Sequence, residues 1–196
     1  MKDQIERAID LVLEQDQNEF LKRLKDEERI DNYIVRPDGI VDVEGDVNLF
    51  EMDLTKIPIK FGVVTGFFDC SHNQLTNLQG APEEVGGSFY CSYNQLTSLQ
   101  GAPEEVGRWF VCHHNLLTSL EGCSKKLKKS FYCYDNQLTT LRGCPEKLGE
   151  VLYCYDNPVY FTHKDIELAK QGKAPLGLPL SFVLMKKGEK EHGKIK

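Results

Sequence analysis

The sequence predicts an α+β repeat fold: a solenoid with a parallel β-sheet on one face, a helical cap at its N-terminal end and a short helical cap at its C-terminal end. The first observation is a 21-residue period, marked by cysteine at positions 70, 91, 112, 133 and 154. An asparagine follows each of these cysteines three positions later, and a phenylalanine or leucine stands two positions before each one. Copies that agree at one interval indicate identical units, each stacked on its neighbours.

Residues 1–30 are predicted to form the N-terminal cap. Residues 3–15 place Ile5, Ile9, Val12 and Leu13 on one helical face, and a second helix, about 17–28, offers Phe20, Leu21 and Leu24. A terminal repeat would otherwise expose its apolar interior, so a polar-backed lid is expected there. The alternative is that these amphipathic helices bind a partner.

Residues 31–63 are predicted to contain a hairpin and a degenerate first repeat. The run Arg36-Pro37-Asp38-Gly39 separates two apolar stretches and has the composition of a turn, because proline presets φ and glycine tolerates positive φ. Met52 occupies the asparagine position of the next copy. Such a departure is typical of the terminal unit of a repeat array.

Residues 64–160 form five repeats, and each is predicted to hold one strand around its cysteine. Alternation along a strand turns Phe89 and Cys91 inward and Ser88, Tyr90 and Ser92 outward. The asparagines end the strands, where a buried amide can satisfy backbone groups of adjacent turns. Gly80 and its equivalents are expected to adopt backbone angles that only glycine accepts readily, and Pro82 and its equivalents keep the return segment extended.

Residues 161–185 are predicted to close the stack, with Thr162 and Asp165 capping a short helix that ends near Gln171. The segment 174–185 is apolar enough to pack on the last repeat or to hold a neighbouring chain. Residues 186–196 are expected to be a flexible basic tail.

The pattern Phe89-x-Cys91-x-x-Asn94-x-Leu96-x-x-Leu99 resembles the core of leucine-rich repeats, with aromatic and sulfur substitutions. The short period and the Gly-Ala-Pro segments are similar to the compact bacterial subclass, in which the convex side is extended. The phrase from Asn73 to Gly87 also resembles repeats in uncharacterised bacteriophage and bacterial proteins. This resemblance implies a fold and, by itself, no reaction.

Composition favours a soluble cytoplasmic protein, in the host cytoplasm if a phage encodes it. The formal net charge of −6 gives no reason to expect nucleic acid or an anionic membrane as a partner. No apolar run approaches the roughly 20 residues of a membrane span. All seven cysteines follow the repeat, Cys123 and Cys144 included, so we interpret them as reduced, buried packing residues.

No motif of an enzyme is recognisable: the chain lacks a phosphate-binding loop, a dinucleotide fingerprint, a zinc-protease helix and a nucleophile elbow. No catalytic residue and no cofactor is therefore predicted. His72 and His114 are expected about 10 Å apart, two strands away from each other, and His113 is expected to point away from His114. No metal site is predicted from them.

The outward positions vary between copies and are rich in aromatic residues, which indicates a recognition surface, since Tyr and Trp are enriched at binding hot spots. The candidate partner-binding residues are Trp109, Tyr90, Tyr93, Tyr132, Tyr134, Tyr153, Tyr155, His72, His113 and His114. Stacking that merely stabilises the sheet is the competing interpretation.

The leading functional hypothesis is a non-catalytic scaffold that binds a bacterial protein, as a phage accessory factor would when it targets or inhibits a host defence protein. One alternative is a structural component that self-associates through residues 174–185. Another is a glycan or small-ligand binder that uses the aromatic residues.

Overall fold

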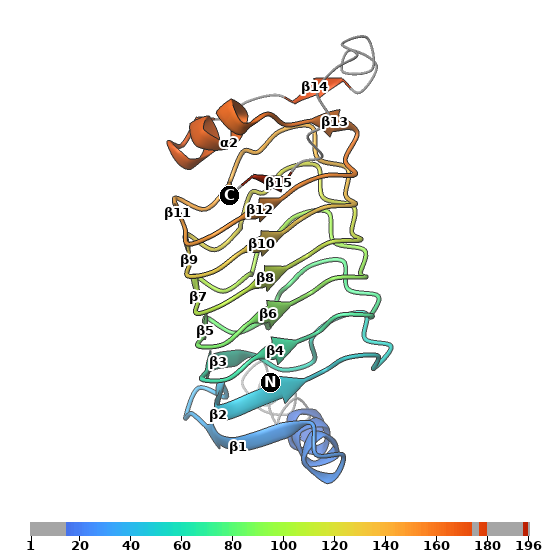
Figure 1. Ribbon diagram of the computed structural model, residues 1–196. Helices are drawn as coiled ribbons and strands as arrows, with labels where there is room; N and C mark the ends of the chain where they lie inside the picture. The colour runs from blue at the N-terminus through green and yellow to red at the C-terminus, as the bar shows by residue number, and fades with distance from the viewer. Residues whose placement is uncertain (1–14, 174–176, 180–193, 196) are drawn as a thin grey trace, which may run out of the picture.

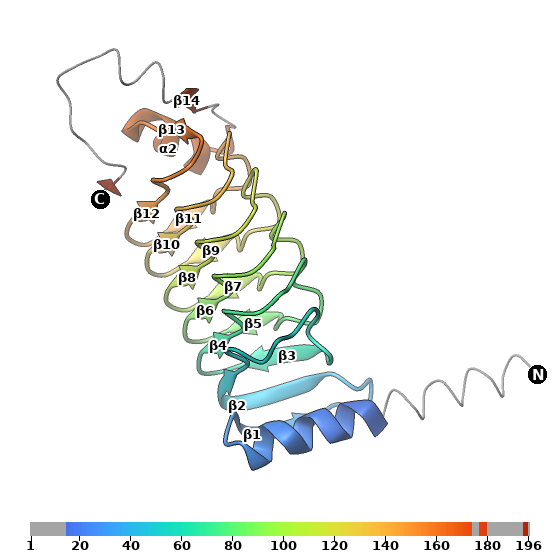
Figure 2. The same cartoon turned by 90° about the vertical axis from the view of Figure 1, so that its right-hand side faces the viewer.

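The computed structural model describes residues 15–173, 177–179 and 194–195, and these form an elongated stack of coils (Figures 1 and 2). The predicted parallel solenoid of about five 21-residue turns is confirmed, since Phe68, Phe89 and Phe110 are neighbours in register on adjacent parallel strands. No helix interrupts the coils between residues 30 and 162. The return segments are therefore extended.

Two ladders of short parallel strands run along the stack and meet at one long strand, β2 (Val41–Asn48). The first ladder consists of β3 (Phe61–Val64), β5 (Glu84–Val85), β7 (Glu105–Val106), β9 (Lys126–Leu127) and β11 (Lys147–Leu148). The second consists of β4 (Phe68–Asp69), β6 (Phe89–Tyr90), β8 (Phe110–Val111), β10 (Phe131–Tyr132) and β12 (Leu152–Tyr153). The two ladders pair end to end with one edge of β2, and the 13-stranded sheet is completed by β1 and β15, which are described below.

The first ladder was not predicted, because the sequence suggested one strand per coil. Val85 and Val106 turn into the core and are at most 2% exposed, so this tract packs as the phenylalanine column does. Its strands contain only two residues each, which is too short for alternation to be recognised in the sequence.

The core consists of inward columns that repeat from coil to coil. The phenylalanines form one column, with ring centroids of Phe89 and Phe110 5.1 Å apart and those of Phe68 and Phe89 5.8 Å apart. Leucines such as Leu96 and Leu99 and the cysteines such as Cys91 are fully buried beside them. Burying each such apolar side chain contributes about 1.5–3 kcal/mol before conformational entropy is subtracted.

The predicted asparagine ladder is also present, and Asn94 illustrates its geometry. Its Nδ2 donates to the carbonyl of Cys70 at 3.0 Å and to that of Cys91 at 3.2 Å, while its Oδ1 accepts from the Leu75 amide at 2.9 Å. One side chain thus joins two coils. Gly101, on the opposite turn of a coil, has a φ of 89°, as expected of a position that favours glycine.

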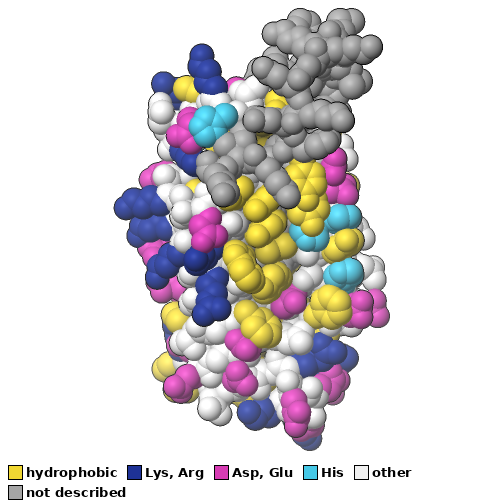
Figure 3. Space-filling view, viewed as in Figure 1, with side chains coloured by type: hydrophobic (Ala, Val, Ile, Leu, Met, Phe, Trp, Pro, Cys, Tyr) yellow, Lys and Arg dark blue, Asp and Glu magenta, His cyan; other side chains and the backbone are white. Residues whose placement is uncertain are grey.

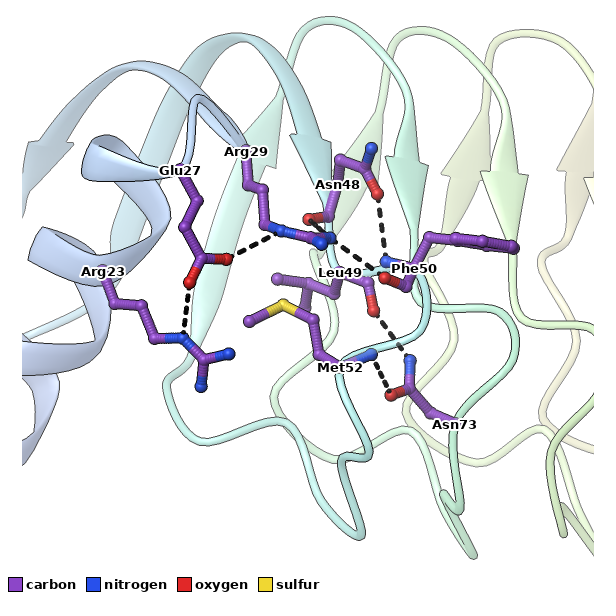
Figure 4. Close-up of polar contacts among 8 residues, drawn as sticks. All are labelled: Arg23, Glu27, Arg29, Asn48, Leu49, Phe50, Met52 and Asn73. Carbon is purple, nitrogen blue, oxygen red and sulfur yellow. Dashed lines mark hydrogen bonds and ion pairs between the residues drawn. The ribbon is translucent and has the colours of Figure 1, made fainter.

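The N-terminal end is closed by a helix of residues 15–26, which buries Leu21 and Leu24, and by β1 (Ile30–Val35), which pairs antiparallel with β2. Figure 4 shows how this cap is fixed to the first coil. Arg29 Nη1 donates to the Phe50 carbonyl at 2.9 Å, and Arg29 Nε contacts Glu27 at the same distance. The first helix predicted, residues 3–15, lies almost entirely outside the described residues.

In the same close-up, Asn73 starts the ladder by donating to the Leu49 carbonyl at 2.8 Å and accepting from the Met52 amide at 3.1 Å (Figure 4). Met52 occupies the asparagine position of this first coil and has no side-chain amide to continue the ladder. The asparagine hydrogen bonds of the coils therefore begin at Asn73.

The C-terminal end is closed by α2 (His163–Lys170), whose predicted capping pair is confirmed. The Asp165 carboxylate accepts from the Thr162 amide at 2.8 Å, and the Asp165 amide donates to Thr162 Oγ1 at 3.3 Å. β13 (Val159–Tyr160) pairs antiparallel with β14 (Leu178–Pro179).

The rest of the segment 174–185 lies outside the described residues, apart from Gly177. Of the tail 186–196, expected to be flexible throughout, Lys194 and Ile195 instead form β15 (Lys194–Ile195), which pairs antiparallel with β12. The other tail residues are outside the described ranges. In the described part of the chain, no helix is both long and apolar enough to cross a membrane.

Candidate functional site

The second ladder presents an outward surface that we call the aromatic face. It is made up of the outward residues of β4, β6, β8, β10 and β12 and of the turns that follow these strands. Figure 3 shows a strip of apolar side chains along the middle of this view, with histidine and acidic side chains on one flank and basic side chains on the other. All ten candidate residues belong to this face.

A row of six rings follows the turns after the strands, and it consists of two stacked groups. In the first group Tyr93 lies between His72 and His114, with centroid distances of 4.1 Å to both and interplanar angles of 26° and 22°. In the second group Tyr134 lies between His113, at 4.4 Å and 15°, and Tyr155, at 4.6 Å and 5°. The two groups meet edge to face at His113 and His114, whose centroids are 5.0 Å apart at 74°, so six of the candidate residues are brought together.

A second, shorter stack lies on the strands themselves. Tyr132 and Tyr153 are parallel within 7°, with centroids 4.6 Å apart. Tyr90 occupies the same column on β6, but Val111 separates it from the pair. Neighbouring rings cover both faces of Tyr93 and Tyr134 and one face of Tyr132, Tyr153 and Tyr155, so ring edges and phenol hydroxyls form most of what the stacks offer to a partner.

The hydroxyls of Tyr132, Tyr134 and Tyr155 remain protonated donors at neutral pH. Partial burial is the main cause that raises the pKa of Tyr132, Tyr134 and Tyr155, and a neighbouring tyrosine adds to the shift in Tyr132 and Tyr134. A partner that contacts this face would therefore meet a row of neutral hydroxyl groups.

Trp109 differs from most of the other candidates, because it has no ring partner among the residues that the structure describes. It is 43% exposed, and its column neighbours are Ser88 and Ser130, which are small and buried. Its indole therefore stands above its surroundings near the middle of the stack. Like Tyr90, it stands outside the stacks, and it is the more exposed of the two.

Arg108 lies next to Trp109 and was missed by the sequence analysis. Its side chain is exposed, and it takes part in no ion pair within the described ranges. The repeat itself marks Arg108 as a departure, since the equivalent position holds glycine in the two preceding coils, Gly66 and Gly87. Trp, Tyr and Arg are the residue types that dominate protein–protein binding energy.

The relation expected between His113 and His114 was wrong. Their rings do not diverge: Nδ1 of His113 lies 2.9 Å from Nδ1 of His114, and His114 Nε2 lies 2.9 Å from Asp135 Oδ2. The cause is the backbone of His114, whose φ of 54° is left-handed. That conformation ends the strand alternation and folds the side chain back over its neighbour.

The same left-handed conformation recurs at each equivalent position: His72, Tyr93, His114, Asp135 and Asp156. His, Asp and Asn are the non-glycine residues that tolerate this conformation best. The residue types at this position therefore indicate a left-handed turn, whereas strand alternation treats the position as extended. Tyr93 is the exception in type, and it is held by rings on both sides.

The serines predicted to point outward are buried, which corrects a second expectation. Ser88 is 4% and Ser92 6% exposed, because larger side chains of adjacent coils cover them. Ser88 Oγ accepts from the Trp109 amide at 3.4 Å. The exposed surface is therefore narrower than the sequence suggested and is formed mainly by the aromatic and charged side chains.

Within the described ranges, no group of three or more His, Cys, Asp or Glu residues is arranged to hold a metal ion. The cysteine column is buried, and burial raises the pKa of thiols such as Cys144 and Cys154 to about 12. What the arrangement can do chemically is recognition through ring edges, hydroxyls, one free indole and flanking charges.

Comparison with known proteins gives no match to a family model, to a curated protein or to a solved structure.

Proposed function

We propose that the protein is a non-catalytic scaffold whose aromatic face binds another protein. The observation that carries this proposal is the pair Arg108 and Trp109: an exposed indole with no ring partner next to a guanidinium with no ion pair, among the residues described. Trp and Arg are enriched among the few residues that carry most of the binding energy of a protein interface.

The stacked rings support a protein partner better than a glycan. Binding a sugar by stacking requires an exposed ring face, whereas neighbouring rings cover both faces of Tyr93 and Tyr134. Ring edges and hydroxyls instead suit the backbone and side-chain acceptors of a protein surface. The stacks then act as a rigid support from which Trp109 projects.

The resemblance to leucine-rich repeats of the bacterial and bacteriophage type supports the same class of function and suggests its setting. In this proposal the chain is a phage accessory factor that targets or inhibits a bacterial host protein. The residues expected to carry affinity are Trp109 and Arg108, with the tyrosine hydroxyls fixing the orientation of the partner.

The test is affinity capture from a bacterial lysate with the wild type and with Trp109→Ala, followed by a binding titration of the captured protein. Removing an anchor of this type should weaken binding by about 2 kcal/mol, close to 30-fold, with little change in melting temperature. Leu116→Ala is the matched control, because Leu116 is 48% exposed and lies outside the aromatic face. Equal capture by wild type and Trp109→Ala would contradict the proposal.

A further inference from the structure

A groove of about 370 Å³ runs along the first ladder, beside the aromatic face. Each coil from β3 to β9 contributes the same three positions to it, for example Glu84, Val85 and Gly86, and Lys147 completes it at β11. Because equivalent positions of successive coils line it, the groove follows the long axis of the stack. Four intervals of ~4.8 Å give it a length of about 19 Å.

The floor of the groove is open because glycine occupies the third position in two coils. The Gly86 amide donates to Val64 and the Gly107 amide to Val85, both at 2.8 Å, which brings the coils into close contact. A Cβ atom would come within 2.3 Å of the Thr65 carbonyl oxygen at Gly86 and within 1.9 Å of the Gly86 carbonyl oxygen at Gly107. Close packing of the coils thus requires glycine, and the absence of side chains leaves the floor accessible.

The charged side chains that line the groove change sign along its length. Glu84 and Glu105 line its N-terminal half, and Lys126, Lys128 and Lys147 line its C-terminal half. Lys126 and Glu105 pair with each other, and this contact lowers the pKa of the Glu105 carboxyl and raises that of the Lys126 ammonium group. The pair neutralises the middle of the groove.

Glu84, in the N-terminal half of the groove, and Lys128 and Lys147, in its C-terminal half, take part in no ion pair within the described part of the chain. All three side chains are exposed. The groove therefore keeps one unpaired negative end and one unpaired positive end, which makes it complementary to a ligand with the opposite order of charge.

We propose that this groove is a second binding site, which takes an extended peptide segment of about six residues with a basic group at one end and an acidic group at the other. An extended chain rises about 3.3 Å per residue, so six residues match the length of the groove. The basic group lies against Glu84 and the acidic group against Lys128 and Lys147. Small side chains in between fit over Gly86 and Gly107.

The site is distinct from the aromatic face, and its test is independent of the function proposed above. The probe is the blocked peptide Lys-Ser-Val-Thr-Val-Glu, compared with two peptides that have the same centre and either lysine or glutamate at both ends. Amide resonances of the protein are followed during the titration by two-dimensional NMR. The Lys/Glu peptide is expected to shift the Gly86 and Gly107 amides in a saturable way, and either like-charged peptide is expected to bind more weakly.

The double variant Lys128→Glu and Lys147→Glu should weaken binding of the Lys/Glu peptide by about tenfold and favour the peptide with lysine at both ends, since two exposed attractions become repulsions. Lys22→Glu with Lys25→Glu is the matched control: it changes the net charge equally on the N-terminal helix and should leave binding unchanged. Trp109→Ala should also leave it unchanged.

Two results would overturn the proposal. One is the absence of saturable shifts at Gly86 and Gly107 with the Lys/Glu peptide. The other is equal or tighter binding of the peptide with glutamate at both ends, which would show that the lysines attract any anion. A well-dispersed spectrum of each variant before titration shows that the coils remain folded.

Discussion

The Nδ1 atoms of His113 and His114 lie 2.9 Å apart, so one ring must donate its proton to the other. His114 Nε2 contacts the Asp135 carboxylate, and His113 stacks on Tyr134. The pKa of His113 falls from its ordinary value of 6.5 to about 4, mainly because burial disfavours the charged ring and secondly because of the neighbouring His114. Two rings that share one proton between their Nδ1 atoms cannot both be charged without losing this contact.

The stability of the fold should therefore decrease in acid through His113. The unfolded chain takes up the proton near pH 6.5, whereas the folded chain resists it until about pH 4. The stabilisation from the neutral ring is complete above pH 6.5 and is lost as the pH falls from there toward 4. Melting temperatures measured between pH 7.5 and 4 should show this decrease.

His113→Tyr should reduce the pH dependence, because tyrosine keeps a ring in a column where Tyr134 and Tyr155 already stand and does not titrate in this range. Gln137→Ala is the control, since Gln137 is exposed and carries no titratable group, so the dependence of the melting temperature on pH should not change. An identical acid slope in His113→Tyr and wild type would show that other groups cause it.

Asn115→Ala should destabilise the protein strongly. Asn115 Nδ2 donates to the carbonyls of Cys91 at 3.0 Å and Cys112 at 3.1 Å, and its Oδ1 accepts from the Leu96 amide at 2.9 Å. Alanine would leave the buried Leu96 amide without a partner, whereas the carbonyls of Cys91 and Cys112 would each lose one of two side-chain donors and still accept from Asn94 and Asn136. An unsatisfied buried amide costs about 1–3 kcal/mol, so the free energy of unfolding should fall by about that amount. Urea denaturation measures this change.

The exposed residue Gln95 provides the comparison, since Gln95→Ala should change the free energy of unfolding by less than about 0.5 kcal/mol. If Asn115→Ala costs no more than Gln95→Ala, the ladder is not a source of stability. Because each coil carries the same asparagine, Asn94→Ala should give a similar loss.

The columns of the core could be predicted from the sequence because burial repeats with the period of the coil. Phe89, Cys91 and Asn94 recur at fixed spacing, and each is buried as expected. The side-chain directions after the strand could not be predicted from alternation, since His114 adopts a left-handed conformation and its ring turns back to His113. Alternation holds only while the backbone stays extended.

Only part of the candidate site could be predicted, because the sequence does not show which side chains flank each ring. The sequence identifies Trp109 and the tyrosines as outward, but it does not distinguish a ring that neighbours cover from one that stands alone. That distinction depends on which residues flank each ring in its column: Ser88 and Ser130 beside Trp109, and Tyr153 beside Tyr132. The groove was missed because it depends on the first ladder, whose strands are too short to be recognised.

Gly107→Ala should weaken the contact between coils. The position of Gly107 in the next coil holds Lys128, and there the inter-coil hydrogen bond to Val106 lengthens to 3.3 Å, compared with 2.8 Å at Gly107 and 2.9 Å at Gly149. A side chain at this position therefore separates the coils. We expect the free energy of unfolding to fall by about 1–3 kcal/mol, which is typical of overpacking.

Thr118→Ala is the control for Gly107→Ala. Because Thr118 is exposed, its replacement should change the free energy of unfolding by no more than about 0.5 kcal/mol. Hydrogen exchange of the Gly107 amide gives a second measurement, and it should become faster in the variant. Unchanged stability together with unchanged exchange would show that the coils accommodate a methyl group here at no cost.

The thiols should be unreactive in the folded protein. Cys70, Cys91, Cys112 and Cys133 have no exposed surface, and burial raises the pKa of each one, so both access and the reactive thiolate are lacking. Cys123 is the partly exposed member of the set. A thiol reagent at pH 8 should therefore modify Cys123 slowly in the native state and all seven cysteines in guanidinium chloride.

Cys123→Ala isolates the buried column, and alanine is suited to the position because Ala81 and Ala102 occupy it in the preceding coils. The folded Cys123→Ala variant should show almost no reaction with the thiol reagent, and the rate of cysteine modification should rise only as the coils unfold. Rapid modification of several thiols in native Cys123→Ala would mean that the coils open locally far below the denaturation midpoint. In that case the cysteines, which pack one above another along the stack, could not be the rigid interior on which the aromatic face and the groove both depend.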